Sequence, residues 1–503
     1  MPLGRRDMVA MALLVAALAI ATIAWGERIG VNGGEGWDGR AYAAWARDFP
    51  GEVLGHGVNA YQSQRVVPSA IVYYATAALG LPHTRAGVIF GFQLLDALCL
   101  VATALVLYRI ARALAWSRAA AWAAFAAVFE SFAVARNALY YPTLTDPTAL
   151  ALGAALVCAF VERRPVAIAA VAVVAAGTWP ALLPLALAAL VLPRPPEPLP
   201  GALPEVTGGW VRLAALAVAA AAALTVVLGL RSGLRHPYHP GLLAAARHEL
   251  FVVTIPTCAA IVAAGAHAVA RQPRTWALVA YVRGLGRWRT ALAIAAGAAI
   301  VVASALWVRR VGTQGSGITV DEFKAMWAES ALRAPLWGAV HHVVYFGPIA
   351  LVAIGAWRHV AAVIARWGPA AVVMAAMLVI LSIATESRVM SHLFVFAAVC
   401  AIEATAERWT PRRAVVFAAL AAVWSKLWWK IGYDVPHDAR GWPDQRFTMH
   451  HGPWASDLTF VLHLAAAVIT AAVLAYMLRP PGQRRVSASP NRQITASSPG
   501  RCA

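Results

Sequence analysis

Long apolar runs separated by short polar connections extend along almost the whole chain. Each run has about 17 to 23 residues, enough for a helix to cross roughly 30 Å of hydrocarbon. Lipid offers no hydrogen-bond partner to the backbone, so such runs have to be helical. The pattern therefore predicts an all-α fold, a polytopic membrane helical bundle with roughly 12 to 14 transmembrane helices.

The first predicted helix lies within residues 1–25, and the later spans lie near 86–108, 119–137, 147–162, 165–178, 179–192, 211–230, 250–270, 290–308, 337–357, 368–384, 389–406, 413–431 and 457–478. The pair between 165 and 192 is short and divided by Trp179-Pro180, so one broken or re-entrant pair is an equal alternative. Residues 66–82 are apolar, but a crossing there would break the alternation of charge. We predict that they form a helix lying on the outer surface.

Basic residues set the expected orientation. Arg5 and Arg6 precede the first apolar run, and no A-x-A-like cleavage site follows it, which favours an uncleaved helix with a cytoplasmic N-terminus. If the predicted spans cross the membrane alternately from there, basic connections such as RIARALAWSR and ERWTPRR lie in the cytoplasm, and most carboxylates lie on the outer side. The C-terminus is then cytoplasmic too, and the expected location is a bacterial-type inner (plasma) membrane.

Composition agrees with this assignment. The chain is 61% hydrophobic and 13% charged, which is far too apolar for a soluble protein. Its net charge of +19 comes from arginines and lysines spread over short connections, which does not indicate nucleic-acid binding. Of five cysteines, four fall inside apolar runs, so neither a disulfide framework nor a zinc site is indicated.

One transmembrane domain is expected over residues 1–478. It contains an extracytoplasmic loop with surface helices at 26–85, a Pro-rich cytoplasmic linker at 193–210, and an extracytoplasmic loop at 432–456. Residues 479–503 read as a disordered basic cytoplasmic tail. The loop at 432–456 is rich in acidic, His, Trp and Arg residues. It could hold an acceptor or close over a site, or it could be an ordinary polar loop.

The segment GWDGRAYAAWARDF, residues 36–49, combines acids and aromatics just after the first helix. On a helix, Asp38, Tyr42, Trp45 and Phe49 share one face, while two arginines lie on the opposite face. Aromatic rings stack on the apolar face of a sugar, and a carboxylate accepts a proton from an attacking hydroxyl. The alternative is that Asp38 caps the helix and the rings rest at the membrane interface.

Two later segments place charged residues at the outer mouths of spans. In LTDPTALALGAAL, Asp146 begins a span; the alternative is a helix cap with Pro147 at the first helical position. In TESRVMSHLFVF, Glu386, Arg388 and His392 lie together, and an arginine there can bind phosphate with two hydrogen bonds. The alternative for that segment is a surface ion pair between Glu386 and Arg388.

These three segments, in this order and on this side, resemble the GT-C superfamily of integral-membrane glycosyltransferases, which includes the aminoarabinose transferase of lipid A and protein O-mannosyltransferases. The resemblance covers residues 1–195 best, including the surface helix and the basic turn after the second span. Beyond that, only topology and the ESRVMSHLF segment support it. This chain has Val389 where tyrosine is common in that late motif, and we do not expect residues 479–503 to form the folded C-terminal outer domain of many relatives.

The resemblance implies an inverting transfer of a sugar from a polyprenyl-phosphate donor to an extracytoplasmic lipid or glycan acceptor. Its implied residues are Asp38 as catalytic base, Arg65 and Arg388 at the donor phosphate, and Tyr42, Trp45, Asp146, Glu386 and His392 in substrate binding. No second aspartate adjoins Asp38 as D-x-D, so no cofactor is predicted, although the sequence leaves a divalent metal open.

Other functions compete with this one. Asp96 and Glu130 lie about ten residues into their spans, and intramembrane carboxylates are typical of a transporter or lipid flippase. That class usually has repeated halves, which we do not detect. A haem or quinone protein would use His341, His342 and His392, but adjacent histidines point about 100° apart on a helix. A non-catalytic scaffold would leave the clustered outer carboxylates unexplained.

Overall fold

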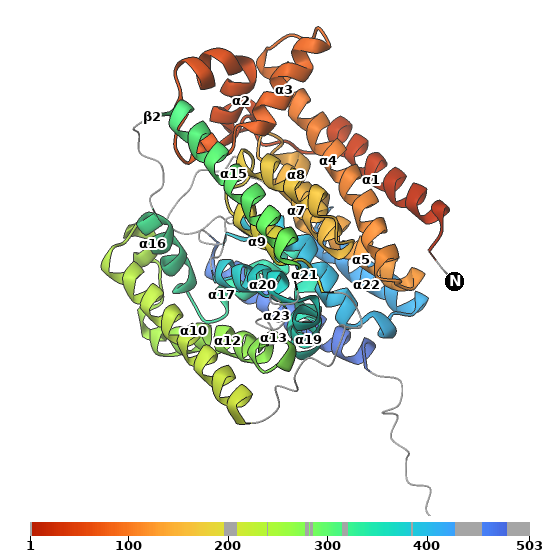
Figure 1. Cartoon of the computed structure of the whole chain (residues 1–503), viewed down its shortest axis with the longest axis vertical. Coiled ribbons are helices and arrows are strands. Elements are labelled where there is room, and N and C mark those ends of the chain that lie inside the picture. The colour runs from red at the N-terminus through yellow and green to blue at the C-terminus, as the bar shows by residue number, and fades with distance from the viewer. Residues whose placement is uncertain are drawn as a thin grey trace, which may run out of the picture.

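A computed structural model describes residues 3–195, 209–238, 240–276, 281, 285–313, 320–383, 386–427 and 455–479. The described part is almost entirely helical (Figure 1). Its strands are β1 (Val58–Asn59) and β2 (Gly312–Thr313), which pair in parallel. The predicted loop at 432–456 lies outside the described residues except for its last two positions. The linker at 193–210 lies outside them except at its ends, and the tail from 480 onward lies outside them entirely.

The helices up to residue 195 are α1 (Arg5–Trp25), α2 (Gly39–Arg47), α3 (Val67–Ala78), α4 (Arg85–Ala113), α5 (Arg118–Phe129), α6 (Ala138–Tyr140), α7 (Asp146–Val161), α8 (Pro165–Ala176) and α9 (Leu182–Val191). The middle of the chain forms α10 (Gly209–Arg235), α11 (Pro240–Ala244), α12 (Phe251–Ala270), α13 (Pro273–Trp276), α15 (Arg287–Val311) and α16 (Val320–Ala331). The last third forms α17 (Trp337–Phe346), α18 (Pro348–Gly355), α19 (Trp357–Trp367), α20 (Pro369–Leu381), α21 (Ser391–Ala404), α22 (Pro411–Ser425) and α23 (Asp457–Met477).

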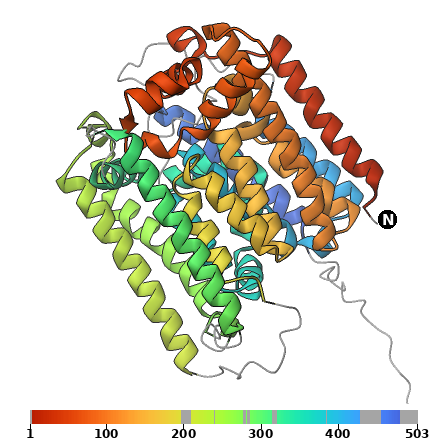
Figure 2. The ribbon, with the colours of Figure 1, turned by 45° about the horizontal axis from the view of Figure 1, so that its top comes forward.

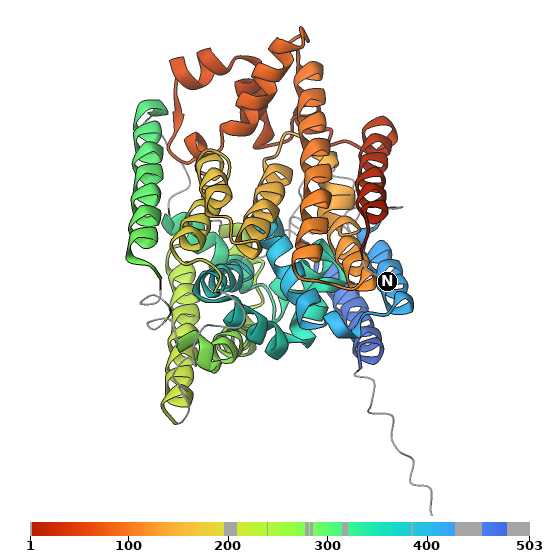
Figure 3. The same cartoon turned by 45° about the vertical axis from the view of Figure 1, so that its right-hand side comes forward.

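Short 3₁₀ or π turns link these helices: η1 (Val31–Gly34), η2 (Pro50–Gly55), η3 (Gln62–Gln64), η4 (Phe132–Asn137), η5 (His248–Leu250), η6 (Ser387–Met390) and η7 (Ala406–Arg408). The centre of the bundle is formed by α4, α7 and α21, because α7 packs against both of the others. Helices α10 and α12 pair at the periphery. Helix α15 runs along the outside (Figure 3). Only 6% of its apolar 18-residue stretch is buried.

Seven helical segments in the described part are long and apolar enough to cross a membrane, or up to nine if two bent pairs each count as one span. These long apolar helices indicate an integral membrane protein, as the sequence predicts. Five shorter apolar helices, α3, α7, α8, α9 and α20, have 10–17 residues. The total of roughly 12 to 14 crossings and the orientation stay predictions.

Two predicted spans are not straight helices. The span predicted at 337–357 is broken at Gly347, whose φ is +78°, and Pro348 then starts a new helix. That helix, α18, bends by 83° into α19, so residues expected to be a cytoplasmic connection are helical. The span predicted at 119–137 bends by 50° between α5 and η4, which places Glu130 at a break and not within a continuous helix.

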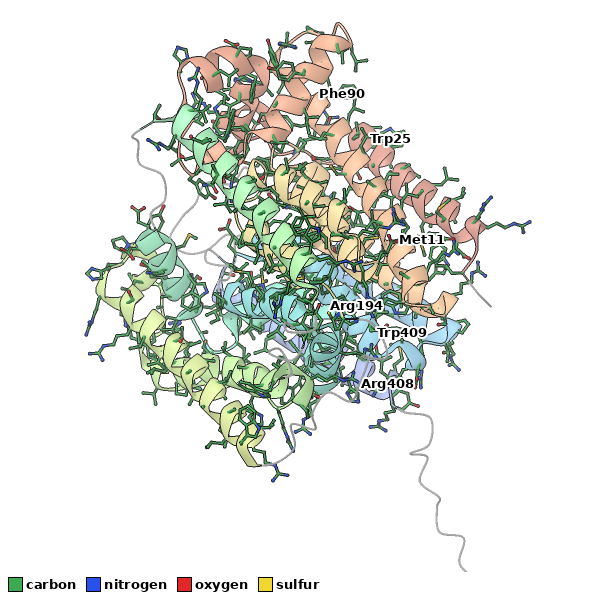
Figure 4. All side chains as sticks on the ribbon, in the orientation of Figure 1. Met11, Trp25, Phe90, Arg194, Arg408 and Trp409 are labelled. Atoms are coloured by element: carbon green, nitrogen blue, oxygen red, sulfur yellow. The ribbon has the colours of Figure 1, made fainter. Side chains whose placement is uncertain are left out.

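Residues 26–85 fold as a cap at one end of the bundle (Figure 2). Helix α3 packs between α2 and α4, and the β1–β2 pair ties the cap to the end of α15. We call this end the cap end. Figure 4 shows Trp25 and Phe90 toward the cap end, and Arg408 toward the opposite end. Several predicted cytoplasmic arginines lie in the connections of that opposite end, among them Arg118, which pairs with Asp7 at 2.7 Å.

A buried carboxylate fixes the cap to the bundle. Glu35 is 1% exposed, and its carboxylate pairs with Arg47 at the end of α2 and with Arg85 at the start of α4, the latter at 3.2 Å. Its carbonyl accepts a hydrogen bond of 2.8 Å from the Thr143 hydroxyl. One residue therefore connects the cap with both α4 and the approach to α7.

The first prediction concerns this anchor. Glu35→Gln should lower the free energy of unfolding by about 1–3 kcal/mol, because two arginines lose their shared carboxylate while remaining partly solvated. Thermal melts in detergent should show a decrease of a few degrees. Glu52→Gln removes an exposed carboxylate of the same cap and should melt like wild type. Equal melting of all three proteins would show that the cap does not depend on Glu35.

Candidate functional site

The Arg388 guanidinium gathers three carboxylates at the cap end of the bundle. Its nitrogens lie 3.1 Å from Asp38 Oδ2, 3.9 Å from Asp146 Oδ2 and 2.5 Å from Glu386 Oε1. Asp38 precedes α2, Asp146 begins α7, and Arg388 lies in η6 just before α21. The structure thus brings together the three segments singled out in the sequence. We call Arg388 and its three carboxylates the Arg388 cluster.

Neither aspartate acts as a helix cap. Asp38 stands at the capping position of α2 but its side chain makes no capping hydrogen bond. Asp146 is the first residue inside α7, and Thr145 occupies the capping position. Both carboxylates are therefore available to Arg388, and the capping alternative does not account for either. The Glu386–Arg388 pair does form, but as part of a larger, mostly buried cluster.

A close backbone approach sets the position of Asp38. The Gly39 N–H donates a 3.1 Å hydrogen bond to the Tyr141 hydroxyl. A Cβ at Gly39 would lie 1.8 Å from Thr143 Oγ1, so only glycine fits there. This contact holds the start of α2 against the segment that leads into α7, and so it holds Asp38 near Asp146.

Arg65 lies beside the cluster without a carboxylate of its own among the described residues. Its guanidinium lies between two aromatic rings, 4.7 Å from the Tyr61 centroid and 4.4 Å from the Trp179 centroid. Its Nε is buried and has no hydrogen-bond partner. Arg65 also lies within electrostatic range of Arg388. Arg65 contacts no carboxylate among the described residues, so it is the guanidinium of this site that is most available to an anion.

Tyr42 reaches this position from α2. Burial raises the pKa of the Tyr42 hydroxyl to about 12, against the opposing effect of nearby Arg65. The group therefore stays a neutral phenol within reach of Arg65 and acts by hydrogen bonding. The rings of Tyr42 and Trp45 are buried and meet edge to face at 5.2 Å between centroids, so neither presents an open face. Their part in sugar binding stays a prediction.

His392 lies one helical turn after Arg388 and is 1% exposed. Its ring lies 5.7 Å from that of Trp179, and its imidazole interacts with the backbone of Val389. Arg65, Trp179 and His392 thus line one side of the site. An imidazole with one nitrogen turned to the backbone keeps the other for a bound ligand.

The adjacent histidines have separate structural roles. His342 bonds to the Ser387 hydroxyl at 2.9 Å and to the Ser382 carbonyl at 2.7 Å, and so it supports η6, where Arg388 lies. His341 is fully buried and bonds through Nδ1 to the carbonyl of Trp337. Among the described residues, no group of three or more His, Cys, Asp or Glu side chains is placed to hold a metal ion.

The two intramembrane carboxyl groups of the transporter alternative lie in different places. Asp96 is fully buried in α4, within electrostatic range of Asp146. Glu130 follows the end of α5, and one of its oxygens is buried without a partner. Asp96 is therefore within electrostatic range of the Arg388 cluster, whereas Glu130 lies at the bend between α5 and η4.

An apolar cavity of about 250 Å³ begins near η6. Met390 and Phe394 line it on one side, and residues of α12, α17, α18 and α20 complete its wall. His342 and Ser382 are its polar contributors, and they bond to each other. The cavity therefore suits a hydrocarbon chain, and Met390 places one part of it two residues from Arg388.

Sequence reasoning missed three residues of this site. Trp179 was noted as part of a helix break, yet its ring covers Arg65. Tyr141 carried no recognisable signal, since it acts through a backbone contact. His342 was considered only for a haem or quinone site, whereas it supports η6.

No protein-family profile matches this sequence, and no curated protein matches it.

The second prediction tests the Arg388 cluster as a unit. Arg388→Met should destabilise the protein by about 3 kcal/mol or more, because it leaves mostly buried carboxylates without their cation. Adding Asp146→Asn should recover part of that loss, so that the two changes are not additive. Asp48→Asn, an exposed carboxylate of the same segment, should add independently to Arg388→Met. Thermal melts of the single variants and of the two double variants measure these effects. If the effects of Arg388→Met and Asp146→Asn simply add, the two residues do not stabilise each other and the prediction is wrong.

Proposed function

We propose that this protein is a membrane glycosyltransferase that moves a sugar from a polyprenyl-phosphate carrier to an acceptor hydroxyl. The observation that carries the proposal is the Arg388 cluster beside Arg65. It combines a reachable carboxylate with a guanidinium that has no carboxylate among the described residues, next to an apolar cavity. A polyprenyl-phosphate sugar has a hydrocarbon chain for the apolar cavity, a phosphate for the guanidinium, and a sugar to be transferred to the acceptor hydroxyl that the carboxylate deprotonates.

Arg65 is the better candidate for the donor phosphate. Arg388 already contacts three carboxylates, whereas Arg65 has aromatic neighbours and a buried Nε without a partner. An N–H donor held by stacked rings suits a phosphate oxygen, since the charged hydrogen bond gains strength where water is excluded. Arg388 then acts by fixing the position of Asp38.

Asp38 is the better candidate for the base. Its side chain is 54% exposed, so an acceptor arriving from water can reach it, whereas Asp146 is nearly fully buried. In the proposed reaction the acceptor hydroxyl loses its proton to Asp38, and its oxygen bonds to the anomeric carbon. The bond from that carbon to the phosphate oxygen breaks, and the electron pair leaves with the phosphate beside Arg65. Attack opposite the leaving group inverts the anomeric centre.

The proposal includes the topology expected from the sequence. With the cap end outside and the basic connections in the cytoplasm, the site faces the extracytoplasmic side of a bacterial-type inner membrane. A bundle of roughly 12 to 14 crossings requires that most of the shorter apolar helices also span. The lipid or glycan acceptor would then approach from the outer side, toward Asp38.

The third prediction concerns the base. Purified wild type should release polyprenyl phosphate from a radiolabelled polyprenyl-phosphate sugar in the presence of an envelope lipid extract as acceptor source. Asp38→Asn should reduce kcat by about 10²- to 10⁴-fold, because the proton acceptor is lost, while its melting temperature stays near wild type. Glu52→Gln, the exposed carboxylate of the cap, should retain activity. Full activity of Asp38→Asn would remove Asp38 from the reaction.

The fourth prediction concerns the phosphate. Free polyprenyl phosphate should inhibit the reaction as a product, and Arg65→Gln should raise its inhibition constant about tenfold or more through loss of a charged hydrogen bond. Arg40→Gln removes an exposed arginine of α2 and should leave the constant unchanged. An unchanged constant in Arg65→Gln would place the phosphate elsewhere.

The same donor assay separates the enzyme from the transporter alternative. A transporter or flippase would leave the sugar–phosphate bond intact while moving the labelled lipid across proteoliposomes. Movement without release of polyprenyl phosphate would overturn the proposed transfer and return Asp96 and Glu130 to the centre of the mechanism.

A further inference from the structure

Buried polar atoms without partners gather between α4 and α7. Both carboxylate oxygens of Asp96 are buried and make no hydrogen bond, and the same is true of both oxygens of Asp146. The amide nitrogen of Gln93 is also buried without a partner. Such groups are rare in folded proteins because each one costs free energy, so a cluster of them indicates a site with an occupant.

These groups lie close to one another. Helices α4 and α7 pack along each other (Figure 1), and Asp146 acts electrostatically on Asp96. Gln93 lies one turn before Asp96 on the same face of α4. The Thr148 side chain hydrogen-bonds with Cys99, which is one turn after Asp96, so α7 meets α4 at this level. Asp96, Asp146 and Gln93 therefore border one polar region, and Asp146 joins it to the Arg388 cluster.

Charge decides what this region can hold. Around Arg388, three carboxylates face two guanidiniums, so an ionised Asp96 would raise the local excess of negative charge from one to two. Neither oxygen of Asp96 contacts a cation in the described part of the chain. Burying an unpaired carboxylate costs more than binding a proton to it, so Asp96 takes up a proton.

Charged groups on the neighbouring helices lie too far along the bundle to change this balance. Helix α1 has its charged residues only at its start, including Asp7, which is paired with Arg118. Helix α3 has no charged residue, and its titratable side chains are Tyr73 and Tyr74. Arg85 begins α4 and pairs with Glu35. Asp146 is thus the charged group that acts on Asp96 from across the helix interface.

We propose that Asp96 and Asp146 form a proton-binding pair, in which one proton is shared between the two carboxyl groups through a bound water between α4 and α7. The proton resides mainly on Asp96, and the negative charge lies mainly on Asp146, which faces Arg388. Gln93 supplies a third hydrogen-bond partner for the water, which needs two to four. A neutral Asp96 donates toward Asp146 and so keeps that carboxylate directed at Arg388.

This inference stands apart from the proposed sugar transfer, since it concerns the protonation of the protein itself. Where the transfer holds, Asp96 is a positioning residue: it acts through Asp146 and Arg388 on Asp38. A test that does not use activity therefore separates failure of the proton pair from failure of the transfer.

Infrared spectroscopy provides that test, because a protonated carboxyl group absorbs above the amide bands. At pH 8, purified wild type should have such a band, and Asp96→Asn should lose it. Asp146→Asn should retain the band at a shifted frequency, because the partner that shares the proton has become an amide. Glu130→Gln is the matched control, since it removes another buried carboxyl group, and it should leave this band in place.

Labelling keeps the test decisive if Asp96→Asn does not fold. Wild type grown with aspartate labelled with ¹³C at the side-chain carboxyl should shift the band to lower frequency without any substitution. The proposal is overturned if labelling does not move the band, or if Asp146→Asn leaves its frequency unchanged. It is also overturned if the band is missing. A melting temperature that rises with sodium would then identify a bound cation in place of the proton.

Discussion

The arrangement at the cap end depends on one guanidinium that holds three carboxylates. Arg388 is mostly buried, and so is Asp146, so neither charge is stable there without the other. Arg388 also pairs with Asp38 of the cap and with Glu386, which lies two residues before it in the chain. This constraint brings the starts of α2, α7 and α21 to one place. Any function assigned to this region has to use the charges that the fold needs for its own assembly.

Backbone approaches set how closely these elements meet. A Cβ at Gly153 would lie 1.9 Å from the His392 carbonyl oxygen, so α7 and α21 touch through glycine at that level. Gly39 allows a similarly close contact between the cap and the Thr143 side chain. Both contacts help to fix the positions of Asp38 and Arg388 relative to Asp146, since Asp38 precedes Gly39 and Arg388 lies one turn before His392. Small residues in this apolar chain therefore decide the geometry of its most polar region.

The site also separates three kinds of surroundings over a short distance. Asp38 is half-exposed, Arg65 is held between two aromatic rings, and Met390 opens onto an apolar cavity. A polyprenyl-phosphate sugar has a reacting carbon, a phosphate and a hydrocarbon chain that match these three kinds of surroundings, which is why this arrangement supports the proposed transfer. Asp96 is fully buried in α4, where an unpaired charge is costly.

The sequence by itself determined the membrane class, the mainly helical fold and the approximate limits of most helices, because apolar length and turn chemistry are local properties. It also singled out Asp38, Asp146 and Arg388, since polar residues are conspicuous in an apolar chain. It could not determine the break at Gly347, which depends on one backbone angle, or the burial of Tyr42 and Trp45. Only the tertiary structure decided that Arg388 binds carboxylates while Arg65 has none in the described part of the chain. Pairing across more than three hundred residues is set by how helices pack, and no local pattern records it.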